Sequence, residues 1–332
     1  MAKIKVVAHV NSSGSAYWRI RDPFKFLNET GEFDCRVASE GITRENTAWA
    51  DIIVTQSTVD KNGIALLREY QVEHGKKLVV ELDDYPKLTE DNPFSLNYEM
   101  QNAGEIIKIT TGIADLVTVS TPYLKKEIKG WGKNIKVLPN LMNMERWDLP
   151  TTKNNTDRVR ILWAGSVTHV EDVKILRSAL NRIAGDYPQT DFYFVGDIRM
   201  RDVFRALPRS EYMLGVDFEA WPSKLAGLQA DIGIAPLQDR EFARSKSAIK
   251  VYEYGLHGMP VVVSPVEPYK RLKGWPVRYA KTDDDWYGHL SELIVDKDKR
   301  DTEGAKLRKK IIKTRSLQGN IGMWVDAYKS IL

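Results

Sequence analysis

The strongest constraint on the fold is a pattern that occurs twice: an apolar strand, a loop that contains glycine, and then a helix. The first copy begins with residues 3–10 (KIKVVAHV) and the second with residues 159–164 (VRILWA). Gly14 lies in the first loop, and Gly165 and Ser166 lie in the second. This pattern opens a doubly wound α/β domain, in which ligands bind at such loops beyond the carboxyl ends of the strands. We therefore expect two such domains that face each other across a cleft.

The length of the chain agrees with two domains, because 332 residues are too many for one ordinary core. Residues 149–158 (LPTTKNNTDR) are polar and lack an apolar period, which predicts a linker. Residues 318–332 carry apolar side chains at helical spacing and are expected to form an amphipathic helix. The expected parts are an N-terminal domain, a linker, a C-terminal domain and a final helix, at residues 1–145, 146–158, 159–317 and 318–332.

Composition and charge exclude several classes of protein. The single cysteine, Cys35, rules out an internal disulfide and is expected to be a buried, inert thiol. No stretch approaches the ~18 apolar residues of a membrane helix, and we expect a cytoplasmic protein. The net charge of +4 is concentrated in residues 297–315, which hold nine basic and three acidic side chains. That stretch fits a solvated helix or a contact with an anionic surface of nucleic acid or acidic lipid.

The stretch from 231 to 269 carries the densest polar chemistry. Residues 232–237 (IGIAPL) form a short apolar run that is typical of a buried parallel strand. A polar loop follows, and from Ser247 apolar side chains recur at helical spacing until Gly258 and Pro260 end the helix. The sequence therefore predicts a strand, a loop, a helix and a further strand at residues 261–263.

Four side chains of this helix are expected on one side of it. Lys246, Lys250, Glu253 and His257 are spaced by four, three and four residues. The backbone amides of residues 246–248, together with the two lysines, form an expected anion site that suits a phosphate. Glu253 is placed to accept hydrogen bonds from hydroxyl groups of the molecule that carries the phosphate. The same spacing also fits an ordinary solvated helix face.

This stretch resembles the nucleotide-sugar signature in the C-terminal domain of GT-B glycosyltransferases, above all the large retaining group with two glutamates eight residues apart. Glu253 matches the second glutamate, which in that family binds the ribose hydroxyls of the donor. The first glutamate falls at Ser245, so the chain departs from the pattern where the hydroxyls of the donor sugar are recognised. A branch of the family instead has Phe, polar residues, Lys-Ser and a further Lys, which correspond here to Phe242, Lys246, Ser247 and Lys250.

The resemblance implies a GT-B fold with a donor site in the C-terminal domain, and a final helix, residues 318–332, that packs back on the N-terminal domain. It implies that Glu253 binds ribose, while Lys246 and Lys250 stabilise the charge that develops on the departing diphosphate. Family members often have Arg and Lys after the loop at Gly165, and their absence here shifts that role to the two lysines and to Arg244. The expected donor-binding residues are Gly14, Gly165, Ser166, Arg244, Lys246, Ser247, Lys250 and Glu253.

The N-terminal half supplies the candidates for the acceptor side. Arg19 lies in the first helical run and is a candidate anion contact, although an ordinary surface arginine fits the same position. Asp83 and Asp84 follow the apolar run 77–81, where they suit hydrogen bonding to a sugar, general-base catalysis or helix capping. The resemblance places Asp83 where many relatives have a histidine near the donor sugar. The expected catalytic residues are Asp83, Lys246 and Lys250, and the expected acceptor-side residues are Arg19 and Asp84.

We expect neither a metal ion nor a cofactor, because the nucleotide sugar is a co-substrate. The aspartate pair at 83 and 84 has no clustered histidine or third carboxylate beside it, and His169 has no second ligand at zinc spacing. His169 and Asp172, which follow the second glycine loop, fit pocket groups and an ordinary helix start equally well.

The expected function is that of a glycosyltransferase that moves a sugar from a nucleoside-diphosphate sugar to an acceptor hydroxyl. Retention and independence of divalent metal are what the resemblance implies. The acceptor stays open among a glycan, a lipid-linked molecule, a small molecule and a modified DNA base. Two alternatives remain: a nucleotide-sugar epimerase or hydrolase of the same fold, and a non-catalytic module that binds a sugar nucleotide or nucleic acid.

Overall fold

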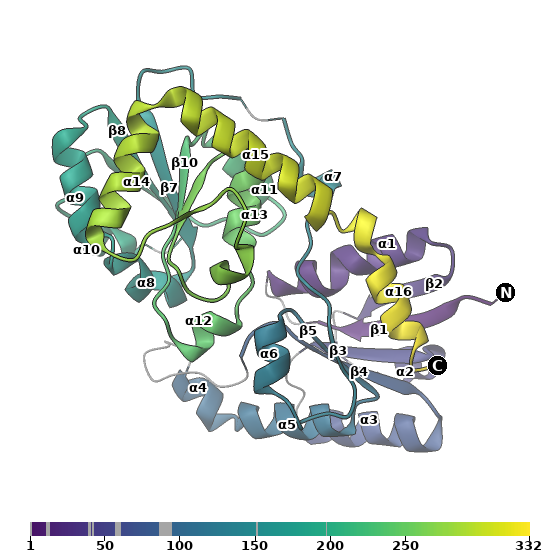
Figure 1. The fold of residues 1–332 in the computed structure, drawn as a ribbon. Helices are drawn as coiled ribbons and strands as arrows, with labels where there is room; N and C mark the ends of the chain where they lie inside the picture. The colour runs from purple at the N-terminus through teal and green to yellow at the C-terminus, as the bar shows by residue number, and fades with distance from the viewer. Residues whose placement is uncertain are drawn as a thin grey trace. The chain divides into compact units, whose positions relative to one another are not determined.

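The computed structural model describes residues 2–10, 14–38, 41, 43–56, 61–85, 95–150, 152–196 and 198–332. The chain forms two compact α/β units (Figure 1). Unit 1 consists of Met1–Met142, Ser245–Ser247 and Leu317–Leu332, and unit 2 of Asn143–Arg244 and Ala248–Ser316. The prediction of two doubly wound α/β units is confirmed, whereas the cleft expected between them stays a prediction.

The sheet of unit 1 has six parallel strands among the described residues, in the order β2-β1-β3-β4-β5-β6. Their bounds are β1 Ile4–His9, β2 Phe33–Ala38, β3 Ile52–Gln56, β4 Lys77–Leu82, β5 Leu116–Val119 and β6 Ile135–Val137. Neighbouring residues of β1 enter different cores, since Val6 belongs to one apolar cluster and Val7 to the other. Both faces of the sheet are therefore covered, as a parallel sheet requires.

Helices cover both faces of this sheet. Their bounds are the π-helix Tyr17–Arg21, α1 Asp22–Glu29, α2 Arg44–Trp49, α3 Lys61–Glu73, α4 Ser95–Met100, α5 Ala103–Ile113 and α6 Pro122–Glu127. Helix α6 starts as its sequence predicts, because the side chain of Thr121 accepts a hydrogen bond from the amide of Leu124 and Pro122 is the first helical residue. Cys35 on β2 is buried, and burial raises the pKa of its thiol to about 12, which confirms the inert thiol.

The C-terminal segment of the chain completes unit 1. It contains a 3₁₀ turn, Gln318–Asn320, and helix α16, Gly322–Lys329. Trp324 of α16 is fully buried in the same apolar cluster as Phe24 and Phe33. The rings of Phe33 and Tyr328 meet edge to face with their centroids 6.4 Å apart. This helix therefore fills one face of the sheet of unit 1.

Unit 2 contains the second parallel sheet, with six strands among the described residues in the order β12-β11-β10-β7-β8-β9. Their bounds are β7 Val159–Gly165, β8 Thr190–Gly196, β9 Ser210–Leu214, β10 Ile232–Ala235, β11 Val261–Val263 and β12 Arg278–Tyr279. Strand β7 has β8 on one side and β10 on the other, so the chain reverses its direction across the sheet between β7 and β10. This order is that of the dinucleotide-binding doubly wound sheet.

The helices of unit 2 are mostly short until the last two. Their bounds are α7 Met144–Trp147, α8 Val170–Lys174, α9 Arg177–Asp186, α10 Met200–Val203, α11 Trp221–Gly227, α12 Glu241–Ser245, α13 Ile249–Leu256, α14 Asp283–Val295 and α15 Lys297–Arg315, with 3₁₀ turns at Val167–His169 and Tyr269–Leu272. Two separate helices follow the loop after β7, because α8 ends at Lys174 and α9 begins at Arg177. Thr282 and Asp285 form a capping box that starts α14.

Candidate functional site

The carboxyl end of β7 is the candidate site of unit 2. Open α/β sheets bind ligands outside the carboxyl ends of their strands, at the point where the strand order reverses. That point lies between β7 and β10. Strand β7 ends at Gly165, and helix α13, which follows β10 along the chain, carries Lys250 and Glu253. The structure therefore brings together Gly165, Lys250 and Glu253 of the expected donor-binding residues.

Close packing places the ammonium group of Lys250 at the end of β7. Its Nζ atom lies 5.9 Å from the centroid of the Trp163 ring. A Cβ atom built on Gly165 would stand 3.2 Å from this Nζ and 2.7 Å from Cζ2 of Trp163. There is therefore no room for a side chain at position 165. Glycine at this position allows the ammonium group of Lys250 to lie against the end of β7.

The buried Tyr254 fixes helix α13 against the sheet. The backbone amide of Ala164 donates a 2.8 Å hydrogen bond to the hydroxyl of Tyr254. A Cβ atom on Gly233 of β10 would lie 2.4 Å from Cδ2 of the same ring, so only glycine permits this approach. Because the helix is held to both strands, the positions of Lys250 and Glu253 are set by the sheet.

Glu253 is a buried carboxyl group, with 8% of the residue exposed. Burial raises its pKa from 4.5 to about 7, against the opposing effects of the Lys250 charge and a hydrogen bond from Trp221. The solvated helix face considered for this residue is therefore wrong. A buried acceptor beside a lysine at this edge of the sheet suits the binding of hydroxyl groups next to an anion.

Helix α13 begins at Ile249, later than the sequence predicted. Its N-cap is Ala248, whose φ of −84° and ψ of 37° lie outside the helical region. Residues 246–248 therefore precede the helix, and the anion site expected from their amides stays a prediction. Lys246 does not lie on the helix, and His257 is its C-cap, so the expected row of four side chains is reduced to Lys250 and Glu253.

Ser166 and Arg244 bond to close neighbours in unit 2. Ser166 is exposed, and its Oγ atom lies 2.8 Å from Oγ1 of Thr168. Nε of Arg244 donates to Oδ1 of Asp239 over 2.6 Å, and this hydrogen bond lowers the pKa of Asp239. Contacts of Ser166 and Arg244 with a donor stay predictions.

A buried pair, His169 and Asp172, joins the segments that follow β7 and β10. Nδ1 of His169 lies 2.8 Å from Oδ2 of Asp172. Oδ1 of Asp172 accepts a 2.9 Å hydrogen bond from the backbone amide of Gln238, whose side-chain amide donates to the carbonyl oxygen of Glu171 over 2.7 Å. The pair therefore positions both segments at the point where the strand order reverses.

In unit 1, Asp83 directly follows β4 and is held by two neighbours. Nδ2 of Asn140 donates to Oδ1 of Asp83 over 3.0 Å, and Oγ of Ser120 donates to its backbone carbonyl over 2.8 Å. Burial raises the pKa of Asp83 above its ordinary value and Asp84 raises it further, whereas Arg19 and Asn140 lower it. A carboxyl group with a perturbed pKa at the carboxyl end of a strand is a candidate for proton transfer.

Arg19 is fully buried, so the surface position considered for it is wrong. Its Nε donates to Oε1 of Glu81 over 2.7 Å, and its Nη1 donates to the carbonyl of Leu138 over 2.5 Å and to Oδ1 of Asn140 over 2.8 Å. Thr118 donates to the second carboxylate oxygen of Glu81. Arg19 thus bonds to the interior of unit 1, and its expected contact with an anion on the acceptor side stays a prediction.

Lys246 and Ser247 belong to unit 1 and contact its candidate residues. Nζ of Lys246 lies 3.6 Å from Oδ1 of Asp84, whose side chain is more than half exposed. Oγ of Ser247 accepts from Nδ2 of Asn140 over 2.8 Å. Unit 1 thus brings together Asp83, Asp84, Lys246 and Ser247, with Asn140 between Asp83 and Ser247. The contact of Lys246 and Ser247 with donor phosphates stays a prediction.

The loop after β1 is described from Gly14 onward. Gly14 is exposed, and Oγ of Ser15 accepts a 3.0 Å hydrogen bond from Nε2 of Gln56, at the end of β3. Ser12 and Ser13 of this loop lie outside the described residues. The role of Gly14 at the donor stays a prediction.

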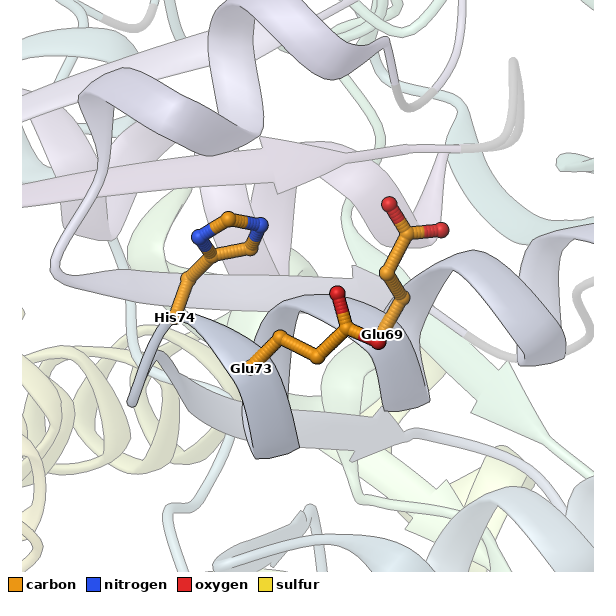
Figure 2. Close-up of side chains that lie close together, drawn as sticks. All are labelled: Glu69, Glu73 and His74. Carbon is orange, nitrogen blue, oxygen red and sulfur yellow. The ribbon is translucent and has the colours of Figure 1, made fainter.

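One cluster with metal-binding geometry occurs in the described part of the chain, away from Asp83. It consists of Glu69, Glu73 and His74, whose ligand atoms lie within 4.8 Å of one another (Figure 2). The cluster lies at the end of α3, just before the amino end of β4, whereas Asp83 follows the carboxyl end of that strand. Glu69 also lies 3.6 Å from Arg44. The cluster therefore does not contribute to the candidate site.

The basic stretch 297–315 is helix α15, and part of its charge is neutralised. Lys297 pairs with Asp301 at 2.6 Å, and Arg308 pairs with Asp148. A contact of this helix with an anionic surface stays a prediction. Among the described residues, no helix combines the length and the apolar character needed to cross a bilayer.

Comparison with known proteins identifies the fold. No protein-family model and no curated protein matches the chain. HepE from Anabaena, solved in complex with UDP-glucose, has a TM-score of 0.68 at 14% identity, with 99% of this chain and 100% of that chain covered. A putative UDP-N-acetylglucosamine 2-epimerase from Listeria monocytogenes has a TM-score of 0.62 at 13% identity, with 99% and 96% covered.

A third similar structure is a variant of TarM from S. aureus, solved with UDP among its ligands. Its TM-score is 0.60 at 10% identity, over 83% of this chain and 55% of that chain. The present chain therefore spans about half the length of TarM. Identities in this range show the fold alone, which is the two-domain α/β fold of the GT-B glycosyltransferases.

Proposed function

We propose that this protein transfers a sugar from a nucleoside-diphosphate sugar to an acceptor hydroxyl. The observation that carries the proposal is the position of Lys250 and the buried Glu253 on helix α13, at the carboxyl ends of β7 and β10 in unit 2. A lysine next to an open glycine position suits a diphosphate, and a buried carboxyl group suits the paired hydroxyls of a ribose. The GT-B fold supports this assignment, since HepE was solved with UDP-glucose and TarM with UDP.

Each candidate residue takes a defined part in this reaction. Glu253 accepts hydrogen bonds from the ribose, and Lys250 stabilises the negative charge that grows on the departing diphosphate. Lys246 and Arg244 stabilise the same negative charge on the departing diphosphate. On the acceptor side, Asp83 and Asp84 bind the sugar or the attacking hydroxyl. The acceptor is a hydroxyl-bearing glycan, lipid-linked molecule, small molecule or modified DNA base.

The stereochemical course that we propose is retention, without a divalent metal. In a retaining transfer the leaving phosphate itself takes the proton from the acceptor, so a protein nucleophile is not obligatory. The lysine side chains supply the charge that a metal ion supplies elsewhere. Full turnover in the presence of EDTA and a product with the donor's anomeric configuration are the expected results; loss of turnover in EDTA, or an inverted product, contradicts this course.

Binding of UDP and UDP-glucose tests the donor site directly. We expect both to raise the melting temperature of the wild-type protein, because a ligand that binds only the folded state stabilises it. Lys250→Ala and Glu253→Ala should each weaken binding by about tenfold or more, the effect of losing a charge-assisted hydrogen bond. Lys273→Ala, an exposed lysine of the same unit, is the matched control. Unchanged affinity in both site variants would falsify the proposed donor site.

A second candidate function is that of a nucleotide-sugar epimerase or hydrolase, because one protein of similar fold is a putative epimerase. The Listeria protein is covered over 96% of its length and is described as a putative UDP-N-acetylglucosamine 2-epimerase. Incubation of UDP-N-acetylglucosamine alone, followed by NMR of the sugar, separates the two. An epimer or free sugar formed without an acceptor favours the epimerase or hydrolase, whereas transfer needs a second substrate.

A further inference from the structure

We infer that Arg19 is a positioning residue, which fixes the orientation of the Asn140 amide and through it the carboxylate of Asp83. This inference rests on the proposed function, because that function places Asp83 at the acceptor side. The network lies wholly within unit 1 and connects the π-helix after β1 to the ends of β4 and β6. Short π-helical segments are frequent at functional sites.

The guanidinium group is held in one orientation because it donates to three buried acceptors. Nε faces Oε1 of Glu81 at 2.7 Å, and Nη1 faces the Leu138 carbonyl at 2.5 Å and Oδ1 of Asn140 at 2.8 Å. The other oxygen of Glu81 is held by the hydroxyl of Thr118. Arg19 and Glu81 are both almost completely buried, at 0% and 2% exposed. The arginine therefore cannot turn toward solvent without leaving a buried carboxylate unpaired.

The direction of each hydrogen bond then determines the orientation of the asparagine. A guanidinium group only donates, so the atom of Asn140 that faces Arg19 must be its oxygen. The amide nitrogen must consequently face Asp83 and Ser247, to which it donates over 3.0 Å and 2.8 Å. Without Arg19 the amide is free to turn and present its oxygen to the carboxylate of Asp83. Arg19 thus decides whether Asp83 meets a donor or an acceptor.

The charges around Asp83 predict how the network is detected. Burial raises the pKa of Asp83 most; among the described side chains, Asp84 raises it further, and Arg19, Asn140 and Ser120 lower it. Glu81 is the further carboxylate beside Arg19, and Lys246 is the ammonium group beside Asp84. Loss of the Asn140 amide, or of its orientation, removes a hydrogen bond to the ionised form and moves the titration of Asp83 to higher pH.

Two variants separate positioning from folding. Arg19→Lys keeps the positive charge beside Glu81 but lacks the fork that reaches Leu138 and Asn140 together. Asn140→Ala leaves the Arg19–Glu81 pair intact. Arg21→Lys is the matched control, since Arg21 lies on the same π-helix and stacks on the ring of Tyr17, 5.4 Å from its centroid.

The first measurement does not depend on activity. The side-chain carboxyl carbon of Asp83 is followed by NMR in protein labelled at aspartate, with the Asp83→Asn spectrum as the assignment. We expect its midpoint to rise by about one pH unit in Asn140→Ala and in Arg19→Lys, and to stay unchanged in Arg21→Lys. An unchanged midpoint in both test variants overturns the positioning role, whatever reaction the protein performs.

The second measurement is UDP release from UDP-glucose across pH, in the presence of an acceptor that the wild-type protein uses. We expect kcat to fall by about tenfold or more in both test variants, KM for UDP-glucose to stay within about threefold, and the acidic limb of the rate profile to move to higher pH. A KM effect with unchanged kcat contradicts the inference. If the wild-type protein neither binds nor turns over any of a panel of nucleoside-diphosphate sugars, the proposed function fails, while the NMR titration still decides the role of Arg19.

Discussion

The hydroxyl of Tyr254 accepts a 2.8 Å hydrogen bond from the backbone amide of Ala164, and this bond ties the helix that carries Lys250 and Glu253 to the strand that ends at Gly165. Both partners are buried. The contact therefore couples the packing of α13 to the geometry of the proposed donor site.

Tyr254→Phe removes this bond with little change in volume. The amide of Ala164 is then buried without its partner, which costs about 1–3 kcal/mol of folding free energy. We expect faster hydrogen exchange at Ala164 and weaker UDP binding, because α13 is less firmly held. Native-state exchange followed by mass spectrometry checks the first effect, and protection equal to that of the wild type would contradict it.

Glu253→Gln should change how stability depends on pH. Burial raises the pKa of Glu253 from 4.5 to about 7 in the folded protein. Between pH 4.5 and about pH 7 the folded state therefore keeps a proton that the unfolded state has released. The resulting stability is complete below the unfolded pKa and is lost as pH rises through about 7. The loss is on the order of 3 kcal/mol across the window.

Urea unfolding from pH 4 to pH 8 measures this effect as the difference between wild type and Glu253→Gln. We expect the wild type to lose stability relative to the variant as pH rises. Parallel pH profiles of the two proteins would show that Glu253 ionises in the folded state as it does in the unfolded one.

Gly165→Ala places a methyl group where no space exists. The new Cβ would stand 2.7 Å from Cζ2 of Trp163 and 3.2 Å from Nζ of Lys250. We expect a loss of about 1–3 kcal/mol of stability and weaker UDP binding, because the lysine is displaced. Gly288→Ala is the control: it lies within α14 with nothing within 4 Å of the new Cβ, and it should stabilise by up to about 1 kcal/mol. Calorimetry and UDP titration of both variants check the contrast.

Trp324→Ala tests the contribution of the C-terminal helix to unit 1. Trp324 is fully buried in the cluster that contains Phe24 and Phe33, so its truncation should cost about 3–5 kcal/mol. Met323→Ala, at an exposed position of the same helix, should change stability by less than about 1 kcal/mol. Chemical unfolding monitored by circular dichroism compares the two, and similar losses in both would mean that α16 adds little to this core.

The apolar runs 3–10, 77–81, 159–164, 232–237 and 261–263 predicted strands that have neighbours on both sides. Residues 3–10 and 159–164 are apolar runs because both faces of β1 and β7 are covered. Three strands were missed: β2, β9 and β12 lie at sheet edges, are partly exposed, and carry polar side chains that interrupt any apolar run.

The sequence predicted which residue types form the candidate site, but it predicted their positions only in part. Lys250 and Glu253 were predicted from a helical spacing and a family resemblance. Asn140, which connects Arg19 to Asp83, carried no signal in the sequence. Spacing on a helix also does not say which face is buried, and for this reason Glu253 and Arg19 both fitted a surface position.

The amino-acid sequence by itself determined the two doubly wound units. Their signals are the spacing of apolar residues, the glycine-containing loops and the helix caps, and each depends only on residues a few positions apart. Only the tertiary structure decided that β7 and β10 adjoin where the strand order reverses, that α13 starts at Ile249, and that Arg19 is buried against Glu81. These features depend on contacts between residues far apart in the chain, and burial sets both the partners and the pKa of each charged group.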